Sequence, residues 1–324
     1  MPAHSDGAPY AGPAATAPRS GGRAGVIHDI GYRGYEGERL GRGFIARSLF
    51  LHSLRGAYGL GRSAKSKVLP MLLFGIMCLP AFVLAITSIV ADTSQVSEPL
   101  LPYTRYAVVL QAALTIFLAA QAPQSVSRDL RFKTVPLYFS RPLERIDYVA
   151  AKYAALAAAL FVLLAVPLLI MYAGALLGGF PFGSQTGDLA LGLLGALLFA
   201  AVLAGVGLVI ASLTGRRGFG VAGIITVLAL SYAVVSSVQG ALAFSGPDGT
   251  AVSSSAETAA EWIGLFSPIT LVDGVQVWAL GAETSSVVGP PDGLGGLVFL
   301  VVTLALVAGC VGLLMLRYRK VPVS

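Results

Sequence analysis

SRDLRFKTVPLYFSRPLERIDYVAAK, residues 127–152, is a polar segment between two long apolar runs. It holds six of the 22 Lys and Arg residues of the chain, together with three acids and two prolines. The flanking runs are long enough to cross a bilayer, so this segment is expected to lie outside it. Because the apolar runs carry almost no charge, the sequence predicts that the segment meets a partner at the membrane surface.

The composition indicates an integral membrane protein. The chain is 56% hydrophobic and 12% charged, with a mean hydropathy of +0.78, whereas an average soluble domain has about 25% charged residues. Its apolar runs are continuous rather than alternating, which favours transmembrane helices over a barrel. Six runs exceed the length of about 18 residues expected of a span: 68–91, 106–126, 149–178, 188–213, 219–244 and 294–316.

Basic residues predict the topology. Ten of the 22 Lys and Arg residues precede the first run, and the others, Arg105 excepted, fall on the same side of a six-span series. The positive-inside rule then predicts both termini in the cytoplasm of a multi-pass plasma-membrane protein. The net charge of +6 is explained by flanks that face anionic lipid, so no nucleic-acid partner is expected.

The sequence before the first span divides into two parts. Residues 1–26 are rich in Ala, Pro, Gly and Ser and are expected to be a disordered cytoplasmic tail. Residues 27–67 form a lead-in with a predicted interfacial helix, or alternatively an ordinary basic linker. The apolar stripe of that helix is Leu40, Phe44, Leu51, Leu54 and Tyr58, with Arg47 near it, Arg55 on the helix, and Leu49 and Phe50 outside the stripe.

The spans themselves, within a domain of residues 68–320, lack ionisable side chains between their ends. Intramembrane charges usually mark ion or proton paths. Gln111, Gln121 and Gln124 of the second span either line a path or, as we favour, hydrogen-bond between helices. Two cysteines within spans offer no disulfide framework, and no metal site is expected.

Small residues mark close helix contacts. Gly174 and Gly178 form a GxxxG motif in the third span, and four glycines leave one face of the fourth span nearly bare. Such faces form either the interior of one subunit or a dimer seam, and both interpretations stay open.

The loop at 245–293 contains an apolar stretch interrupted by Gly, Pro and Asp. Ser267 before Pro268 predicts a helix start with a serine cap. Trp262 and Trp278 are typical of a membrane interface. We expect an external re-entrant or interfacial hairpin between spans five and six, because a full crossing would place the basic C-terminal residues outside.

Six spans, an interfacial helix, a basic loop after the second span and an external hairpin resemble the permease subunits of ABC-2 type transporters, notably actinobacterial ones. The most specific stretch is Ser127–Tyr153, and GYRGYEG at 31–37 resembles the lead-in of such permeases. The resemblance implies that the 127–152 loop presents a coupling helix to a separate cassette ATPase, and that the hairpin is an outer gate or lid.

Within that loop, charged residues could form a docking surface beside apolar ones, and Ser140 could cap the helix that enters the third span. The alternative is a merely solvated loop, which explains the charge but not the apolar residues and prolines among it. The residues predicted to couple to the ATPase are Arg128, Asp129, Arg131, Phe132, Lys133, Pro136, Tyr138, Ser140, Arg141 and Pro142.

The predicted function is thus that of a non-catalytic exporter permease. No G-x-x-x-x-G-K-[ST] motif occurs, so the chain itself is expected to bind no cofactor, and ATP is expected on a cognate ABC ATPase. The other expected partners are membrane lipid and a second permease, identical or homologous. A secondary ion-coupled transporter and an ABC-linked scaffold without transport remain alternatives, and no residue selects a substrate.

Overall fold

The computed structural model describes residues 40–61, 63–90, 99–132, 143–214, 216–243 and 254–319, all within one compact unit. These residues form helices and short connections, and no strand occurs among them. The predicted tail (1–26) and the lead-in as far as residue 39 lie outside these ranges. The all-helical prediction is confirmed for the described part of the chain.

Five long helices are apolar enough to cross a membrane. Two further helix pairs meet the same test but are bent by 61° and 114°, so the described residues offer between five and seven spans. A helix satisfies its backbone hydrogen bonds internally, as a bilayer requires. The five helices are α2 (Ala64–Val90), α7 (Arg145–Leu177), α8 (Phe182–Leu213), α13 (Leu294–Arg319) and a continuous helix made of α9 (Arg217–Ile225), a π-helical turn η2 (Thr226–Leu230) and α10 (Ser231–Ala243).

The apolar run at 106–126 is broken, so the prediction of one continuous helix there is wrong. A turn η1 (Tyr103–Arg105) leads into α3 (Tyr106–Val109), and the chain bends by 61° before α4 (Gln111–Ser125). Tertiary hydrogen bonds hold the first part: the Tyr106 hydroxyl donates to the Met77 carbonyl of α2, and the Tyr103 hydroxyl to Gln185 of α8 at 2.7 Å. These bonds fix the short helix independently of α4.

Glycines bring α2 and α7 together. A Cβ at Gly174 would lie 2.4 Å from the Cα of Ala85, and one at Gly178 would lie 2.1 Å from the carbonyl oxygen of Ser88. Real Cβ atoms do not approach backbone this closely, so only glycine fits. The GxxxG motif therefore packs two helices of the same subunit, and it is not a dimer seam.

α8 is the central helix, and its glycines face four different neighbours. Gly192 lies against Tyr103 of η1, Gly195 against Gln276, Gly205 against Cys310 of α13, and Gly207 against Leu118 of α4. The bare face predicted from the sequence is therefore internal packing of the subunit.

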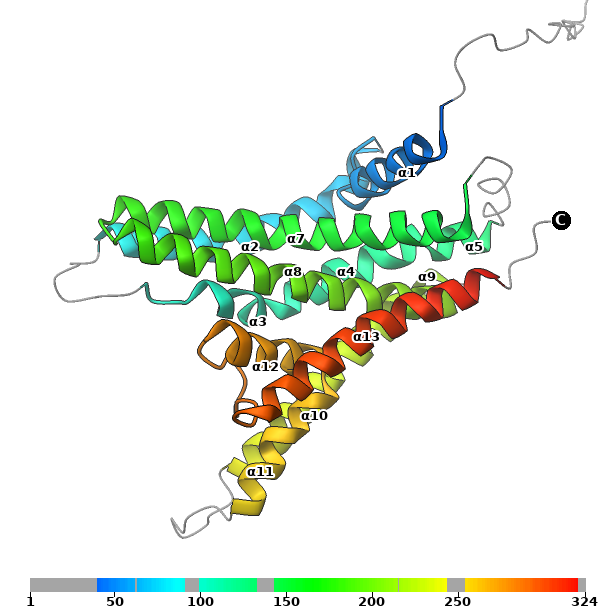
Figure 1. Ribbon diagram of the computed structural model, residues 1–324. Helices are drawn as coiled ribbons and strands as arrows, with labels where there is room; N and C mark the ends of the chain where they lie inside the picture. The colour runs from blue at the N-terminus through cyan, green and yellow to red at the C-terminus, as the bar shows by residue number, and fades with distance from the viewer. Residues whose placement is uncertain are drawn as a thin grey trace, which may run out of the picture. The chain divides into compact units, whose positions relative to one another are not determined.

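Figure 1 shows α2, α7 and α8 side by side, with α1 (Arg42–Ala57) beside one end of α7. The same end carries α5 (Ser127–Arg131) and the last turn of α13. α1 is joined to α7 by the Tyr58 hydroxyl, which donates to the Ala159 carbonyl at 2.7 Å.

A bent helix pair lies between α10 and α13, where the hairpin was predicted. α11 (Ser254–Ile263) and the turn η3 (Gly264–Phe266) meet α12 (Pro268–Leu280) at 114°. The Ser267 hydroxyl accepts a hydrogen bond from the Ile269 amide at 3.3 Å, and Pro268 is the first helical residue. This is the serine cap that the sequence predicts.

Candidate functional site

A cluster of polar side chains joins α5 to the start of α7. Lys152 Nζ lies 3.0 Å from Asp129 Oδ2, and the Tyr148 hydroxyl donates to the same oxygen at 2.7 Å. Lys152 also donates to the Ser125 carbonyl at the end of α4, again at 3.0 Å. We call Ser125, Asp129, Tyr148, Lys152 and Tyr318 the α5–α7 cluster.

The ion pair of this cluster is largely removed from solvent, with side-chain exposures of 8% for Lys152 and 17% for Asp129. Burying two charges costs several kcal/mol unless further hydrogen bonds satisfy them. Here the ammonium group has a carbonyl partner and the carboxylate has a tyrosine hydroxyl partner. The pair therefore holds α5 at one defined position against α7.

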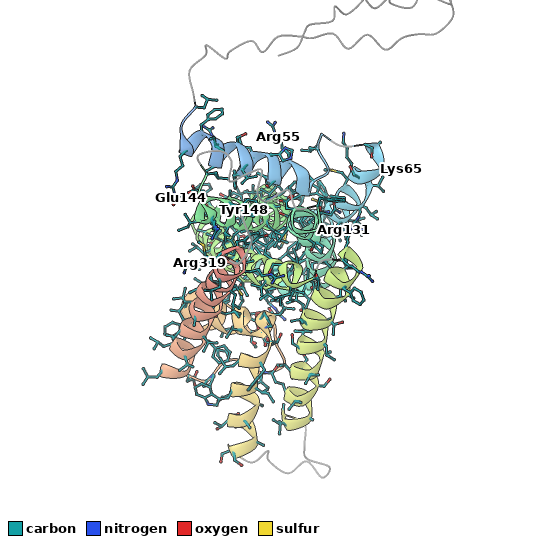
Figure 2. The ribbon with its side chains drawn as sticks, turned by 90° about the vertical axis from the view of Figure 1, so that its right-hand side faces the viewer. Arg55, Lys65, Arg131, Glu144, Tyr148 and Arg319 are labelled. Atoms are coloured by element: carbon teal, nitrogen blue, oxygen red, sulfur yellow. The ribbon has the colours of Figure 1, made fainter. Side chains whose placement is uncertain are left out.

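Tyr148 extends the cluster to α13. Its ring lies 5.0 Å from that of Tyr318, at an angle of 58°, and both tyrosines are fully buried. Such tilted pairs are favourable beyond their burial alone. Arg145 Nη1 donates to the Arg319 carbonyl at 3.0 Å, which gives the end of α13 a second connection to α7. Figure 2 shows Glu144, Tyr148, Arg131 and Arg319 at this end of the molecule.

The start of α7 is also bound to α1. Arg42 donates to Asp147 from Nε at 2.6 Å and from Nη2 at 2.9 Å, and it forms an ion pair with Glu144. The hydrogen bond to Asp147 is the largest cause of a raised pKa of the Arg42 guanidinium, and the contact with Glu144 raises this pKa further. Since the bidentate geometry fixes direction as well as distance, α1 is oriented on α7.

α7 begins at Arg145 with Glu144 as its N-cap, so the predicted cap at Ser140 is wrong. Glu144 and Asp147 form a capping box, in which the Glu144 amide donates to Asp147 at 3.0 Å. The acids at positions 144 and 147 were the sequence signal for this start, because they have capping-box spacing.

Both described ends of the 127–152 segment are thus fastened to the helix bundle. Residues 127–132 are held to α7 by Asp129 and to α8 by the Ser127 hydroxyl, which donates to the Ala211 carbonyl at 2.7 Å. Residues 143–152 are held to α1 and α13 by Arg42 and Arg145. A displacement of this segment would be transmitted to α7, α8, α1 and α13 through these hydrogen bonds and ion pairs.

The predicted coupling residues lie in different settings. Asp129 bonds to Tyr148 and Lys152 inside the cluster, and its part in a docking surface stays a prediction. Arg131 and Phe132 are exposed at the end of α5, with the guanidinium carbon 5.7 Å from the ring centroid. The Arg128 side chain, together with Lys133, Pro136, Tyr138, Ser140, Arg141 and Pro142, lies outside the described residues.

Lys152 was not singled out from the sequence as a site residue. The sequence nevertheless indicates that Lys152 lies beside Tyr148, because the two residues are four positions apart on α7 and therefore share one helical face. Their partner Asp129 is 23 residues before Lys152 in the chain, and helical periodicity does not connect such distant positions.

A helix, α1, is present where the sequence predicts one, and its apolar residues occupy two faces; its position at the membrane interface stays a prediction. Leu49, which broke the predicted stripe, is buried against the bundle, and Phe50 and Leu54 are partly buried there. Phe44 and Leu51 are 56% and 37% exposed instead, and Arg47 and Arg55 are exposed beside them. The single apolar face predicted from the sequence was wrong because α7 covers a different side of α1.

The three glutamines of α4 do not converge on one point. Gln111 and Gln121 are ten residues apart, which is about 15 Å along a helix. Gln121 is buried, whereas Gln111 and Gln124 are partly buried. Their roles in a path or in packing stay predictions.

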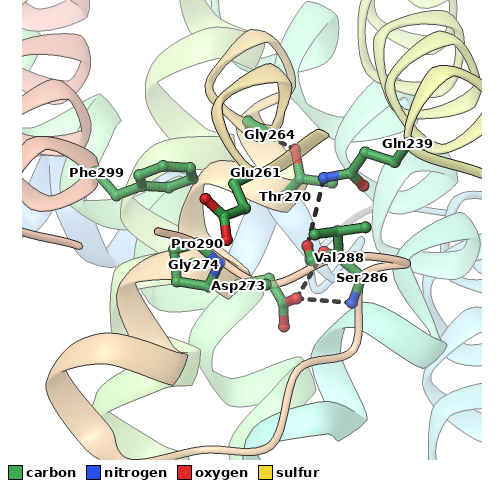
Figure 3. A pocket seen from close by; sticks show the side chains of 11 residues that line it. Gln239, Glu261, Gly264, Thr270, Asp273, Gly274, Ser286, Val288, Pro290 and Phe299 are labelled. Carbon is green, nitrogen blue, oxygen red and sulfur yellow. Dashed lines mark hydrogen bonds between the residues drawn. The ribbon is translucent and has the colours of Figure 1, made fainter. Parts of the chain in front are cut away.

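The interior of the hairpin contains a carboxylate that the sequence analysis missed. Asp273 of α12 is 3% exposed and accepts hydrogen bonds from the amides of Ser285 and Ser286 at 3.1 and 2.8 Å and from the Ser286 hydroxyl at 2.6 Å. Figure 3 shows Asp273 bonded to Ser286 beside Gln239 of α10. The Gln239 amide donates to the carbonyls of Ala260 and Val288. An acid within an apolar helix was the available signal, and its partners indicate that it anchors the loop after α12.

Both tryptophans lie in this region. Trp278 of α12 covers Gly296 of α13, where a Cβ would fall 1.9 Å from its ring, and Trp262 packs against the cluster of Leu271, Val275 and Phe299. Gly274 also lies against Phe299, at 2.4 Å from a hypothetical Cβ to the ring. The hairpin is therefore interlocked with α13.

A cavity of about 220 Å³ lies between η1, the start of α8 and the end of α12. Asp188 and Glu283 line it, and Arg105 Nη1 forms an ion pair with Glu283 at 3.3 Å. Among the described residues, no three His, Cys, Asp or Glu side chains are grouped to hold a metal ion.

The chain matches no protein-family model and no curated protein sequence. Its function is therefore argued from its own residues.

Proposed function

We propose that this chain is the membrane-spanning permease subunit of an ABC exporter of the ABC-2 type. In this proposal it hydrolyses no ATP, and a cognate cassette ATPase binds at the 127–152 segment. A second permease, identical or homologous, completes the path through the plasma membrane.

The proposed topology has six spans: α2, the bent pair α3–α4, α7, α8, α9–α10 and α13. The α11–α12 hairpin enters from the outside without crossing, which leaves both termini in the cytoplasm. This arrangement is supported by the charges, because it brings Lys65, Arg131, Arg145, Arg217 and Arg319 to one side of the membrane, which the positive-inside rule assigns to the cytoplasm.

The observation that carries the proposal is the fastening of both described ends of the 127–152 segment. An ATPase that binds at the cytoplasmic surface and does not enter the membrane needs a cytoplasmic element of the permease whose displacement moves several spans at once. Asp129–Lys152, Ser127–Ala211, Arg42–Asp147 and Arg145–Arg319 provide such connections to α7, α8, α1 and α13.

The composition of the spans supports ATP hydrolysis, rather than an ion gradient, as the proposed source of energy. The span interiors lack ionisable residues, which disfavours a proton or sodium relay. Asp273, a buried acid of the hairpin, already accepts several hydrogen bonds from the Ser285–Ser286 loop. A separate ATPase is the remaining driver, and the outer gate is assigned to the hairpin around Trp262 and Trp278.

The proposal is tested by ATP turnover in proteoliposomes that contain the full chain, alone and together with a cassette ATPase that co-purifies with it. We expect no turnover by the chain alone and turnover by the complex. Arg128→Glu with Arg131→Glu should leave the complex assembled but uncouple transport from hydrolysis. Arg216→Glu with Arg217→Glu is the matched control, since it reverses two charges of another turn. Turnover by the isolated chain, or normal transport by the first double variant, would contradict the proposal.

A further inference from the structure

We propose that α1 carries a binding surface for the headgroups of anionic phospholipids on the side facing away from α7. This outer face of α1 consists of Phe44, Arg47, Ser48, Leu51, His52 and Arg55, which are all exposed. The inference needs only a membrane-embedded chain and is independent of the proposed transport function.

The two faces of α1 differ in what they contact. On the inner side, Leu49 and Ala57 are buried, Tyr58 bonds to α7, and Arg42 is paired with Asp147. The outer side has none of these contacts. Since the inner side already holds the helix in place, the outer face is not needed to fix α1 to the bundle.

The position of α1 is that of a helix in the headgroup layer. Figure 2 shows α1 lying across the edge of the molecule at the end that carries Arg131 and Arg319, with Arg55 pointing outward and Lys65 at the start of the next helix. This end is where the long apolar helices α2, α7 and α13 begin or finish. A helix at the ends of spans, parallel to the membrane surface, meets lipid headgroups on its outer side.

The positive charge of α1 and of the start of α2 favours anionic over neutral phospholipids. Residues 39–91 contain no Asp or Glu, whereas Arg47, Arg55, Lys65 and Lys67 are exposed there. None of the described acidic side chains forms an ion pair with Arg47 or Arg55, although Arg42 on the same helix forms two. The outer face thus presents positive charge that the described part of the chain does not neutralise.

The mixture of residue types points to a lipid rather than to an acidic protein. Arg47, Leu51 and Arg55 are spaced by four residues and share one face. Leucine and phenylalanine side chains can enter the acyl boundary while guanidinium groups bind phosphate at the surface. The exposed apolar surface continues onto α2 with Val68 and Leu72, so the outer face of α1 borders a lipid-facing surface.

The probes are dioleoyl phosphatidylglycerol and dioleoyl phosphatidylcholine, titrated onto the delipidated full chain in a neutral detergent and counted by native mass spectrometry. We expect preferential binding of phosphatidylglycerol. Arg47→Gln with Arg55→Gln should weaken that binding at least about tenfold, because each basic residue near an anionic surface contributes about fivefold. Binding of phosphatidylcholine should not change.

Two controls keep the result specific. Arg216→Gln with Arg217→Gln removes two exposed charges elsewhere and should weaken phosphatidylglycerol binding less than the α1 double variant does, because these charges do not belong to the outer face of α1. Arg47→Lys with Arg55→Lys should retain most of the binding. An unchanged helical circular-dichroism spectrum shows that each variant is folded. Equal phosphatidylglycerol binding by the Gln double variant and the wild type would overturn the proposal. So would a Gln variant that keeps its lipid and instead loses a bound protein.

Discussion

The α5–α7 end of the molecule and the hairpin end are held together by different interactions. At the α5–α7 end, helices are joined by charged and hydroxyl side chains, with Lys152 and Asp129 at the centre. At the hairpin end, Gly274 and Gly296 lie directly against Phe299 and Trp278, and the Asp273 carboxylate binds the backbone of its own loop. The first set of bonds can re-form after a shift, whereas interlocked rings and glycines resist one.

The difference indicates which parts can move. We infer that the hairpin moves as one piece with α13, and that the polar contacts of the α5–α7 end transmit a displacement of α5 and α1 to α7. This assigns the transmitting contacts to the proposed ATPase side. The following predictions separate the two kinds of interaction, from the largest expected effect to the smallest.

Breaking the buried ion pair is expected to have the largest effect. Lys152→Met removes the cation 3.0 Å from Asp129, and removing one partner of a buried ion pair destabilises a protein by about 3–5 kcal/mol. Adding Asp129→Leu should recover most of this loss, because the charge is then removed as well. The free energy of unfolding in mixed micelles measures both variants. Equal losses of unfolding free energy in the single and double variants would show that the Asp129–Lys152 ion pair does not hold α5 to α7.

Gly274→Ala tests the interlocked end. The added Cβ falls 2.4 Å from the Phe299 ring, and overpacking of this kind costs about 1–3 kcal/mol. Gly309→Ala in α13 is the matched control, because no atom lies within 4 Å of its hypothetical Cβ. The melting temperature in detergent should fall for the first variant only. Similar melting of both variants would mean that the hairpin is loosely held.

Ser267→Ala removes the N-cap of α12, the hydroxyl that accepts a hydrogen bond from the Ile269 amide. Loss of such a cap typically costs about 1 kcal/mol. Ser48→Ala, on the exposed side of α1, should leave the same unfolding measurement unchanged. If Ser267→Ala has no effect either, the hairpin does not depend on its cap.

Arg42→Gln should have the smallest effect on global stability, because the Arg42 side chain is 46% exposed in its ion pairs with Glu144 and Asp147. Its expected signature is local: faster hydrogen exchange in peptides covering 42–57, with little change in α13. Arg47→Gln, on the same helix but without a described ion pair, should not raise that exchange. Equal exchange in the wild type and in Arg42→Gln would show that this pair does not orient α1.

The long helices could be predicted from the sequence because length and hydropathy alone decide them. The break at Leu110 could not, since no proline or glycine marks it and its cause is the bonding of Tyr103 and Tyr106 to other helices. The GxxxG of α7 was recognised, but only the structure shows that α2 is its partner.

The candidate site was predicted as a region, not as a set of contacts. The polar segment 127–152 could be delimited from the sequence, because charge density between apolar runs is a local property, and its role in coupling stays a prediction. The inward direction of Asp129 and its pairing with Lys152 depend on how α5 folds back on α7. The burial of Leu49 on α1 could not be predicted for the same reason, since it is set by the neighbouring helix α7.

The most direct test of the central claim is affinity purification of the full chain with and without an intact 127–152 segment. The wild type is compared with a variant in which residues 133–142 are scrambled, and both are checked for equal expression and melting temperature. We predict that a protein with the G-x-x-x-x-G-K-[ST] motif and ATPase activity co-purifies with the wild type and is lost from the variant. Equal recovery of that ATPase with both chains, or its absence from the wild type, would contradict the account.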